Sequence, residues 1–324
     1  MRSIWREILM SVFMAMILPG ILLNWKVEEE AKPENVEFQP ISPQQPVNRV
    51  RLTMKLRRSD GSVEEMDMDT YLVGVVLAEM PSTFELEAKK AQAVAARTFA
   101  RKAFVTGGKH GDGSVCAEAG CCQAWLTAEK YLQMGGSEKA LAQARAAVDA
   151  TSGYVLTYAG SLIEATYFSC SGGSTEDAVA VWGAEYPYLI SVDSPGEEHA
   201  VHHTDAVPFT KQELEERLGV KLSGQPEQWF HSASYTQGGG VESIVVSGKT
   251  FSGTELRALL GLRSTAFTVE ATGEGVTITT RGFGHRVGLS QYGADAMAAS
   301  GSTFEEILAH YYPGTSLELT NEPE

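Results

Sequence analysis

The chain contains few cysteines and few positive charges for its length. Only 4 of its 324 residues are cysteine, which is too few for a disulfide scaffold in a protein of this size. Lysine and arginine total 26 against 41 aspartate and glutamate residues, giving a formal net charge of −15. This balance disfavours DNA, RNA or another polyanion as a general partner. The hydrophobic fraction of 43% is nevertheless sufficient for a folded core.

One long apolar run lies at the N-terminus, between Ile8 and Leu23, with arginines before it and a tryptophan near each end (Arg2, Arg6, Trp5, Trp25). A transmembrane helix needs about 20 residues, and interfacial tryptophans extend this run. The arginines predict a cytoplasmic N-terminus, with the remainder outside the cytoplasm. We therefore expect residues 1–27 to form a cytoplasmic stub and a retained membrane anchor. A cleaved secretory signal is the alternative, although no small-x-small cleavage site follows.

A short linker is expected to separate the anchor from the folded part. Residues 28–48 contain 4 of the 12 prolines together with many Glu and Gln residues. Such a composition cannot bury a core and is typical of an extended spacer. The folded domain is therefore predicted to occupy residues 49–320.

The domain's sequence mixes helix and hairpin patterns without regular βαβ alternation. The predicted hairpins cover 50–68, 154–168 and 267–281, with a further strand at 241–246. The predicted helices cover 71–79, 85–104, 137–150, 208–218, 253–260, 289–299 and a segment after residue 305, with capping boxes at 82–85 and 302–305. This mixture predicts an α+β fold, arranged as a two-lobed unit with a cleft.

Glu79 has the most unusual setting among the acidic residues. It follows the apolar segment Val73 to Ala78 and precedes Met80-Pro81. Apolar surroundings raise the pKa of a carboxyl group, and a raised pKa suits a general acid at neutral pH. Composition alone leaves a second interpretation open, in which Glu79 ends a helix and faces water.

Four potential metal ligands lie within thirteen positions: His110, Cys116, Cys121 and Cys122. Four such groups can close a tetrahedral zinc site of the structural type. Free thiols are an alternative, as is a disulfide, including one to Cys170. A bridge between the adjacent Cys121 and Cys122 would be strained.

Several long motifs carry a family resemblance. They are Tyr71–Pro81, Lys90–Phe99, Tyr167–Thr175, Val181–Gly183 with Pro187–Leu189, Ser191–Pro195 and Gly284–Ala294. In this order they resemble the stage II sporulation protein D family, which comprises membrane-anchored lytic transglycosylases related to the amidase enhancers. The resemblance spans about residues 50–315.

The resemblance implies that Glu79 is the catalytic acid. It implies cleavage of peptide-free peptidoglycan strands between N-acetylmuramic acid and N-acetylglucosamine, giving 1,6-anhydro ends during engulfment in sporulation. The expected location is the mother-cell membrane, with the domain facing the intermembrane space. The expected protein partners are the stage II sporulation proteins P, an amidase, and M, a membrane protein.

The resemblance also implies a structural zinc ion and no organic cofactor. Some family members bind zinc in the pattern His-x5-Cys-x4-His-Cys, and Cys121 here stands in place of the second histidine. This implies a ligand set of His110, Cys116, Cys121 and Cys122, in which Cys121 departs from the pattern.

The sugar-binding residues are predicted in the same motifs: Tyr167, Ser169, Ser171, Gly172, Gly173, His285, Ser290, Gln291, Tyr292 and Arg97. Glycines at a hairpin end would allow a ligand to approach the backbone closely. Turn chemistry for the serines and glycines and a structural role for His285 are the alternatives. Tyr292 could belong to the core, and Arg97 could orient Glu79 or lie on a solvated helix face.

Two other function classes were considered. A non-catalytic module that recruits or activates an amidase would not need Glu79 in its Ala-Glu-Met-Pro setting. A zinc-dependent or redox hydrolase would need an open metal site or a Cys-x-x-Cys pair, and neither is present in the sequence.

Overall fold

The computed structural model describes residues 52–320. The predicted anchor at 1–27 and the predicted linker at 28–48 lie outside the described residues. Among the helices of residues 52–320, none combines the length and apolar character that a membrane span requires.

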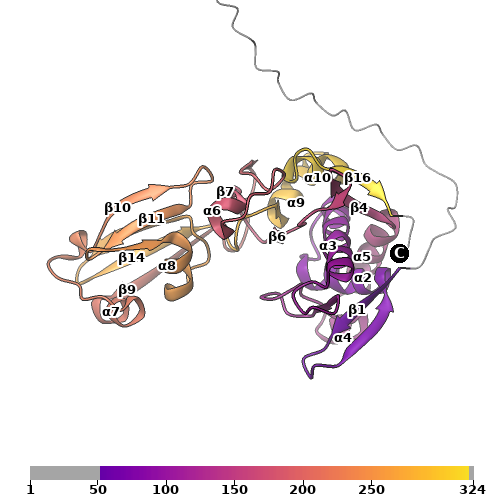
Figure 1. Ribbon diagram of the computed structural model, residues 1–324, viewed down its shortest axis with the longest axis horizontal. Coiled ribbons are helices and arrows are strands. Elements are labelled where there is room, and N and C mark those ends of the chain that lie inside the picture. The colour runs from indigo at the N-terminus through magenta and orange to yellow at the C-terminus, as the bar shows by residue number, and fades with distance from the viewer. Residues whose placement is uncertain (1–51, 321–324) are drawn as a thin grey trace, which may run out of the picture. The chain divides into compact units, whose positions relative to one another are not determined.

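Three helices form the centre of the first hydrophobic core: α2 (Met68–Glu79), α3 (Leu86–Thr106) and α5 (Glu138–Ala150) (Figure 1). The stretch 91–96 in the middle of α3 is fully buried, as predicted from its small apolar residues. Small side chains allow neighbouring helices to approach α3 closely. Ser137 caps α5 as expected, accepting a hydrogen bond from the backbone N–H of Ala140 at 3.1 Å.

The predicted first hairpin is confirmed. Strand β1 (Thr53–Arg57) pairs antiparallel with β2 (Val63–Asp67), and its other edge pairs in parallel with β3 (Ser114–Cys116). The segment 107–123, expected to be irregular, therefore contributes one short strand. A short helix, α4 (Ala128–Gln133), was not predicted.

Three helix starts differ from the predictions. Helix α2 begins at Met68, three residues before the predicted start, and Asp67 caps it by accepting a hydrogen bond from the Thr70 N–H at 3.0 Å. The expected capping box at 82–85 does not form, because the Glu85 N–H donates to Asp295 Oδ1 at 2.7 Å. Helix α10 (Phe304–Tyr311) begins with a capping box formed by Thr303 and Glu306, one residue later than predicted.

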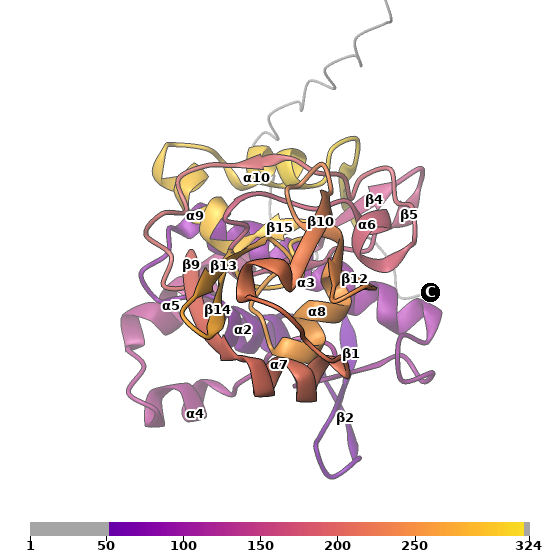
Figure 2. The same ribbon diagram turned by 90° about the vertical axis from the view of Figure 1, so that its left-hand side faces the viewer.

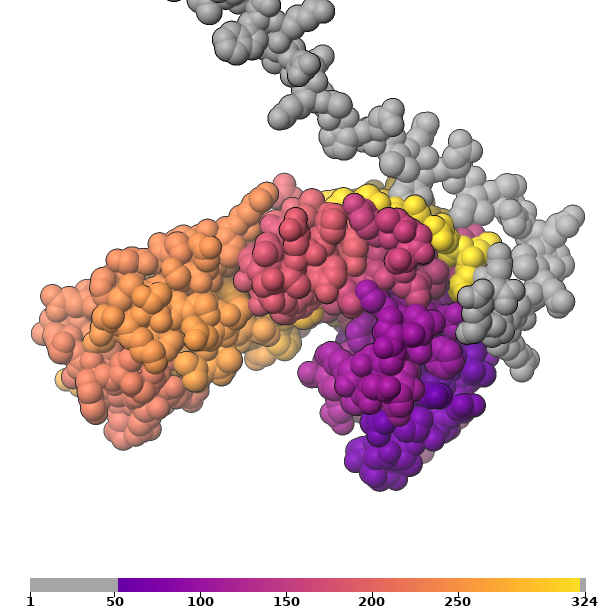
Figure 3. Space-filling view, in the orientation of Figure 1, coloured from indigo at the N-terminus to yellow at the C-terminus, as the bar shows by residue number. Residues whose placement is uncertain are grey.

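The predicted hairpin at 154–168 is only partly correct. Strand β4 (Tyr154–Tyr158) pairs with β5 (Ser161–Leu162) on one side and with β16 (Ser316–Leu319) on the other. Strand β6 (Tyr167–Phe168) pairs instead with β15 (Leu289–Ser290). In the space-filling view the yellow C-terminal residues accordingly lie against the segment that begins near residue 150 (Figure 3).

Pairing of β6 with β15 brings the second half of the sequence to the first core. Helix α9 (Gln291–Ala299) starts directly after β15, with Ser290 as its N-cap. It therefore begins two residues later than predicted, because Leu289 and Ser290 belong to the strand. Gln291 is the first residue of this helix.

Residues 204–281 form a second hydrophobic core. Strands β9, β13 and β14 lie side by side in one three-stranded sheet (Figure 2). A second three-stranded sheet, formed by β10, β11 and β12, and the helices α7 and α8 cover the same core. In chain order the elements are β9 (Thr204–Thr210), α7 (Lys211–Leu218), β10 (Phe230–Tyr235), β11 (Val241–Val246), β12 (Lys249–Ser252), α8 (Gly253–Leu260), β13 (Phe267–Thr272) and β14 (Gly275–Arg281).

The helix predicted at 208–218 is wrong in its first turn. Pro208 lies in β9, and helix α7 starts three residues later, with Thr210 as its N-cap. β9 is an edge strand of its sheet, where a residue without a backbone N–H is tolerated.

The mixture of helices and largely antiparallel sheets confirms the α+β class. The described residues contain two hydrophobic cores, and their arrangement as two lobes stays a prediction. The cleft stays a prediction.

Candidate active site and metal cluster

Glu79 is the last residue of α2, and the sequence around it explains this position. The apolar run before it is buried in the first core, with Tyr71, Leu72 and Val75 fully covered. Met80 is extended, as expected for a residue that precedes a proline, and the helix ends there. Glu79 is therefore held at the edge of an apolar core.

The surroundings of the Glu79 carboxyl group are uncharged. Burial raises its pKa, and hydrogen bonds from the Ala124 N–H to Oε1 at 2.7 Å and from Gln291 Nε2 to Oε2 at 3.5 Å partly oppose this. No carboxylate among residues 52–320 contributes to this shift. A single carboxyl group that is oriented by neutral hydrogen-bond donors is suited to act as a general acid.

Further polar side chains lie around this carboxyl group. The Tyr71 hydroxyl donates to Gln123 Oε1 at 2.7 Å, which leaves Gln123 Nε2 buried and without an acceptor. The Tyr167 hydroxyl is also buried, and its interaction with the Glu79 carboxylate lowers the pKa of Glu79. Burial and the nearby Glu79 charge raise the pKa of Tyr167 itself.

A second polar contact links Gln291 to α3. Gln291 Nε2 lies 3.3 Å from Gln92 Oε1, and Gln92 Nε2 is likewise buried without a partner. Buried polar groups normally have hydrogen-bond partners. Two amide nitrogens without an acceptor, Nε2 of Gln92 and Nε2 of Gln123, indicate a place near Glu79 where a polar ligand or water completes the network.

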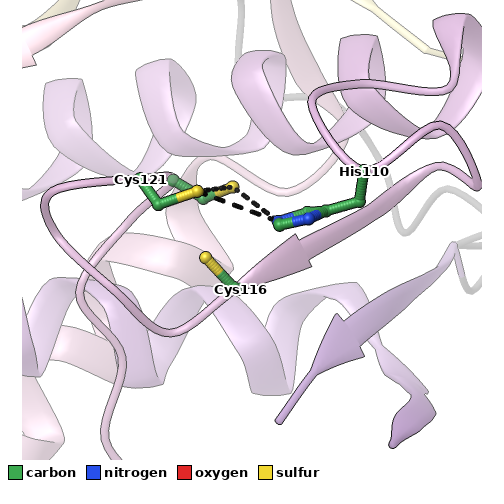
Figure 4. A group of neighbouring side chains, drawn as sticks. His110, Cys116 and Cys121 are labelled. Carbon is green, nitrogen blue, oxygen red and sulfur yellow. Dashed lines mark hydrogen bonds between the residues drawn. The ribbon is translucent and has the colours of Figure 1, made fainter. Parts of the chain in front are cut away.

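The four predicted metal ligands come together in one cluster (Figure 4). Their ligand atoms all lie within 4.8 Å of one another. Sγ of Cys122 is 3.6 Å from His110 Nε2, and Sγ of Cys121 is 3.9 Å from both His110 Nε2 and Cys122 Sγ. A tetrahedral site with Zn–S bonds of about 2.3 Å places its ligand atoms roughly 3.5–3.8 Å apart. The residues present, including Cys121, therefore fit a tetrahedral zinc ion.

Thiolates are the form of cysteine that binds metals. Burial tends to raise the pKa of the Cys116 thiol, but hydrogen bonds from the Glu118 backbone and from its cluster neighbours lower it overall to about 7. Among the described residues, all four cysteines are free of disulfide bonds. The cluster therefore offers at least one thiolate near neutral pH.

Three consecutive residues connect the cluster to Glu79. Cys122 belongs to the cluster, Gln123 accepts from Tyr71, and the Ala124 N–H donates to Glu79. The next residue, Trp125, donates from its indole to the Tyr71 carbonyl at 3.1 Å. A metal ion in the cluster would thus fix the backbone that orients the carboxyl group.

Comparison with known proteins identifies the family of the chain. The family model for Stage II sporulation protein matches residues 57–158, which include Glu79 and the metal cluster. Stage II sporulation protein D of Bacillus subtilis (strain 168) is 41% identical over 265 residues, covering 81% of this chain and 77% of the relative. The protein of the same name from Bacillus amyloliquefaciens is 40% identical with the same coverage.

The chain belongs to the stage II sporulation protein D family. An amidase enhancer of Bacillus subtilis (strain 168) is also related, at 31% identity over 304 residues, covering 76% of this chain and 40% of that protein. Family membership connects the chain with sporulation.

Two of the sugar-binding residues expected from the family resemblance lie at Glu79. Gln291 contacts the carboxyl group, and Tyr167 is buried beside it. Tyr292 packs on Phe84 with ring centroids 4.9 Å apart, and its N–H donates to the Ser169 carbonyl at 3.0 Å. Roles of Tyr292 and Ser169 in sugar binding stay predictions.

Arg97 does not lie in the site. Its guanidinium is fully buried and donates to the carbonyls of Thr151 at 2.7 Å and Tyr154 at 3.2 Å. The expectation that it contacts substrate or orients Glu79 is wrong, and so is the alternative of a solvated face. Its charge instead binds the C-terminal end of α5.

The buried carboxylate of Glu197 accepts hydrogen bonds from Ser171, Gly172 and Ser290. Glu197 Oε2 accepts hydrogen bonds from Ser171 Oγ at 2.8 Å and from the Ser171 and Gly172 N–H groups at 2.7 and 2.8 Å, while Ser290 Oγ donates to Oε1. Both serines are fully buried. Direct sugar contacts by the two serine side chains, as expected from their motifs, are therefore excluded in this conformation, and the role of Gly172 stays a prediction.

The close approach expected at Gly172 is to the protein's own backbone. A Cβ atom there would lie 2.7 Å from the backbone nitrogen of Gly282, and its φ is +75°. Gly173 is exposed, with open space at its Cβ position, and its role as a ligand contact stays a prediction. Cys170 is a buried free thiol, so the alternative of a disulfide to it is not realised, and its Sγ donates to Glu197.

Sequence reasoning missed four residues: Gln92, Gln123, Tyr71 and Glu197. Gln92 carried a signal, since it is the one polar residue in the apolar stretch 91–96. Gln123 directly follows the cysteine pair, but only the fold brings it to Tyr71. Glu197 lies in an acidic loop segment that gives no indication of burial.

Proposed function

We propose that this protein is a peptidoglycan lytic transglycosylase that cleaves peptide-free glycan strands during engulfment in sporulation. The bond cleaved would join N-acetylmuramic acid to N-acetylglucosamine. The observation that carries the proposal is Glu79, a buried carboxyl group with a raised pKa and neutral hydrogen-bond donors, whose pKa no other carboxylate of residues 52–320 shifts.

One carboxyl group is sufficient for this reaction. Protonated Glu79 gives its proton to the glycosidic oxygen as the bond from C1 of muramic acid breaks. The C6 hydroxyl of the same sugar then attacks C1, and the Glu79 carboxylate accepts the hydroxyl proton. Proton and electron pairs balance, and the products are a 1,6-anhydro end and a free C4 hydroxyl group. Hydrolytic glycosidases need a second carboxylate to activate water or to attack the sugar, and in the described part of the chain none contributes to the pKa shift of Glu79.

The neighbouring groups suit both halves of this cycle. Burial favours the protonated acid needed for bond cleavage. The Ala124 N–H and the Gln291 amide stabilise the carboxylate after proton transfer. The unpartnered amides of Gln92 and Gln123 are available to orient a polar group next to Glu79.

The test is digestion of peptide-free glycan strands by the wild-type protein and by Glu79→Gln. Glutamine is nearly isosteric and can keep the bond from the Ala124 N–H, so the fold should be retained. Loss of general acid catalysis should lower the cleavage rate on the order of 10²–10⁴-fold. Glu138→Gln, an exposed residue in the first turn of α5, is the matched control and should cleave normally. Cleavage by Glu79→Gln at the wild-type rate would contradict the assignment.

We further propose that His110, Cys116, Cys121 and Cys122 hold a structural zinc ion. The ion would cross-link the segment that carries Gln123 and Ala124, without contacting the substrate. Elemental analysis of the purified protein should give one zinc per chain, and Cys116→Ser should lose it. A folded wild-type protein without metal would contradict this proposal.

Residues 1–27 are proposed to anchor the protein in the mother-cell membrane, with the domain in the intermembrane space. There it would act with the stage II sporulation proteins P and M, on strands from which an amidase has removed the stem peptides. The related amidase enhancer makes amidase activation the competing function. Stimulation of an amidase without any glycan cleavage would favour that competing function.

A further inference from the structure

An exposed apolar patch lies on the segment that contains the short helix α6 (Ala178–Trp182). Val179 is 53% exposed, Trp182 44% and Ile190 41%. Val179 and Trp182 are three positions apart, and therefore lie on one face of the helix. Among residues 52–320, Trp182 and Tyr235 are the exposed large aromatic side chains. Grouped exposed apolar side chains, unlike single ones, are typical of binding surfaces.

The Trp182 ring is held in place by contacts that lead to the strand carrying Tyr167. It packs on the imidazole of His285, with ring centroids 5.2 Å apart and an angle of 56°. His285 in turn contacts Phe168, with centroids 5.6 Å apart. The residue before Phe168 is Tyr167, whose hydroxyl is buried beside Glu79. Tyr167 and Phe168 are consecutive residues of strand β6, so their side chains point to opposite faces of the strand. The ring contacts therefore join the exposed indole to the strand that carries Tyr167.

The imidazole that Trp182 packs on is uncharged at neutral pH. Burial and the positive charges of Arg257 and Lys109 lower the pKa of His285 to about 4, so the imidazole is uncharged at neutral pH. Its Nδ1 accepts a hydrogen bond from the Val287 N–H at 3.1 Å, which leaves the proton on Nε2. A surface of this kind does not select a charged peptide, but it suits an uncharged ligand with both apolar and polar edges.

The Trp182 indole also offers an available donor. Its Nε1 makes no hydrogen bond with any residue in the described part of the chain. Sugars present C–H groups on their faces and hydroxyl groups at their edges, so a sugar ring can stack on an indole and accept from its N–H. A protein partner would require a larger buried area than three side chains provide.

We propose that Trp182 is the platform for a sugar ring of the glycan strand, at a binding subsite on the Tyr167 side of Glu79. The occupant is a neutral N-acetylated sugar of the substrate, one or more residues away from the bond that is cleaved. This inference rests on the proposed function, because the glycan strand is its substrate. It adds a subsite that extends the contact surface beyond the acid.

The test measures binding of purified peptide-free glycan strands to the full chain carrying Glu79→Gln, which holds the strand without cleaving it. In this background Trp182→Ala should weaken binding about tenfold, as expected for the loss of one aromatic stacking contact. Trp182→Phe should retain most of the affinity. Tyr235→Ala, which removes the other exposed aromatic ring, should bind as the parent does. In the otherwise wild-type enzyme, Trp182→Ala should raise KM and leave kcat nearly unchanged.

The outcomes separate this inference from the proposed function. If the Glu79→Gln parent binds no glycan, the proposed function fails. If the parent binds and Trp182→Ala binds equally well, the subsite fails while the proposed function stands. If Trp182→Ala folds poorly, the tryptophan fluorescence of the parent and of Trp182→Phe, each measured with and without glycan, tests the subsite instead. Glycan should change the emission of the parent and not that of Trp182→Phe, and an identical change in both would overturn the subsite.

Discussion

Arg97→Ala provides a sharp test of the structure, because the fold assigns this residue to stability. The Arg97 guanidinium is fully buried and donates to the carbonyls of Thr151, Tyr154 and Val148 at 2.7, 3.2 and 3.4 Å. It also forms an ion pair of 3.4 Å with Asp69. Burial lowers its pKa to about 10, which still leaves it charged at neutral pH.

Truncation would leave these carbonyls buried without a donor at the end of α5. A buried acceptor left unsatisfied costs about 1–3 kcal/mol, and breaking a buried charged network costs roughly 3–5 kcal/mol in total. We therefore expect Arg97→Ala to lower the free energy of unfolding by about 3–5 kcal/mol. This is a large part of the total, since the free energy of unfolding of a domain is about 5–15 kcal/mol. Part of the protein could then be unfolded at 37 °C.

The assay is urea unfolding at pH 7, followed by circular dichroism. Arg97→Lys keeps the charge with fewer donors and should lose an intermediate amount. Arg145→Ala, an exposed arginine on α5, is the control and should change stability by no more than about 0.5 kcal/mol. A stable Arg97→Ala protein that no longer binds glycan would refute the structural role and restore a substrate contact.

Three further predictions concern the acid and its support. Chelation of the metal, or Cys122→Ser, should slow glycan cleavage and move the alkaline limb of the pH–rate profile to higher pH. The reason is that the Ala124 N–H, which lowers the pKa of Glu79, is no longer held in place by the metal cluster. An unchanged pH–rate profile would contradict this link between the cluster and Glu79. Gly74→Ala would place a methyl group 2.3 Å from Trp125 Nε1 and should cost about 1–3 kcal/mol in thermal unfolding; wild-type stability would show that this contact is loose. Because burial raises the pKa of Glu79, the native state binds its proton more tightly than the unfolded state, and stability is lost as pH rises through this range. Glu79→Gln should therefore be more stable than the wild type at pH 8 and similar to it below pH 4, as two melting curves would establish.

Local signals were sufficient to predict much of the fold. The cap at Ser137 and the hairpin at 267–281 follow from short-range patterns, and both are confirmed. The metal cluster was also predictable, because its four residues lie within thirteen positions. Glu79 could be singled out because a proline ends its apolar helix. In each case the decisive residues are neighbours in sequence.

Long-range contacts account for what was missed. β6 and β15 are two-residue strands more than 100 positions apart, and no local pattern pairs them. The capping box at 82–85 fails because Asp295 binds the Glu85 N–H. The burial of Arg97 and Glu197 depends on carbonyls and hydroxyls supplied by distant segments. The same applies to Gln123, whose contact with Tyr71 requires the folded loop.

The most direct test of the proposed activity is product analysis after digestion of peptide-free glycan strands in H₂¹⁸O. Attack by the sugar's own C6 hydroxyl uses no water, so mass spectrometry should detect 1,6-anhydro ends without ¹⁸O, and none of these products with Glu79→Gln. Reducing ends that carry ¹⁸O would instead establish hydrolysis, and would contradict a mechanism in which Glu79 acts alone.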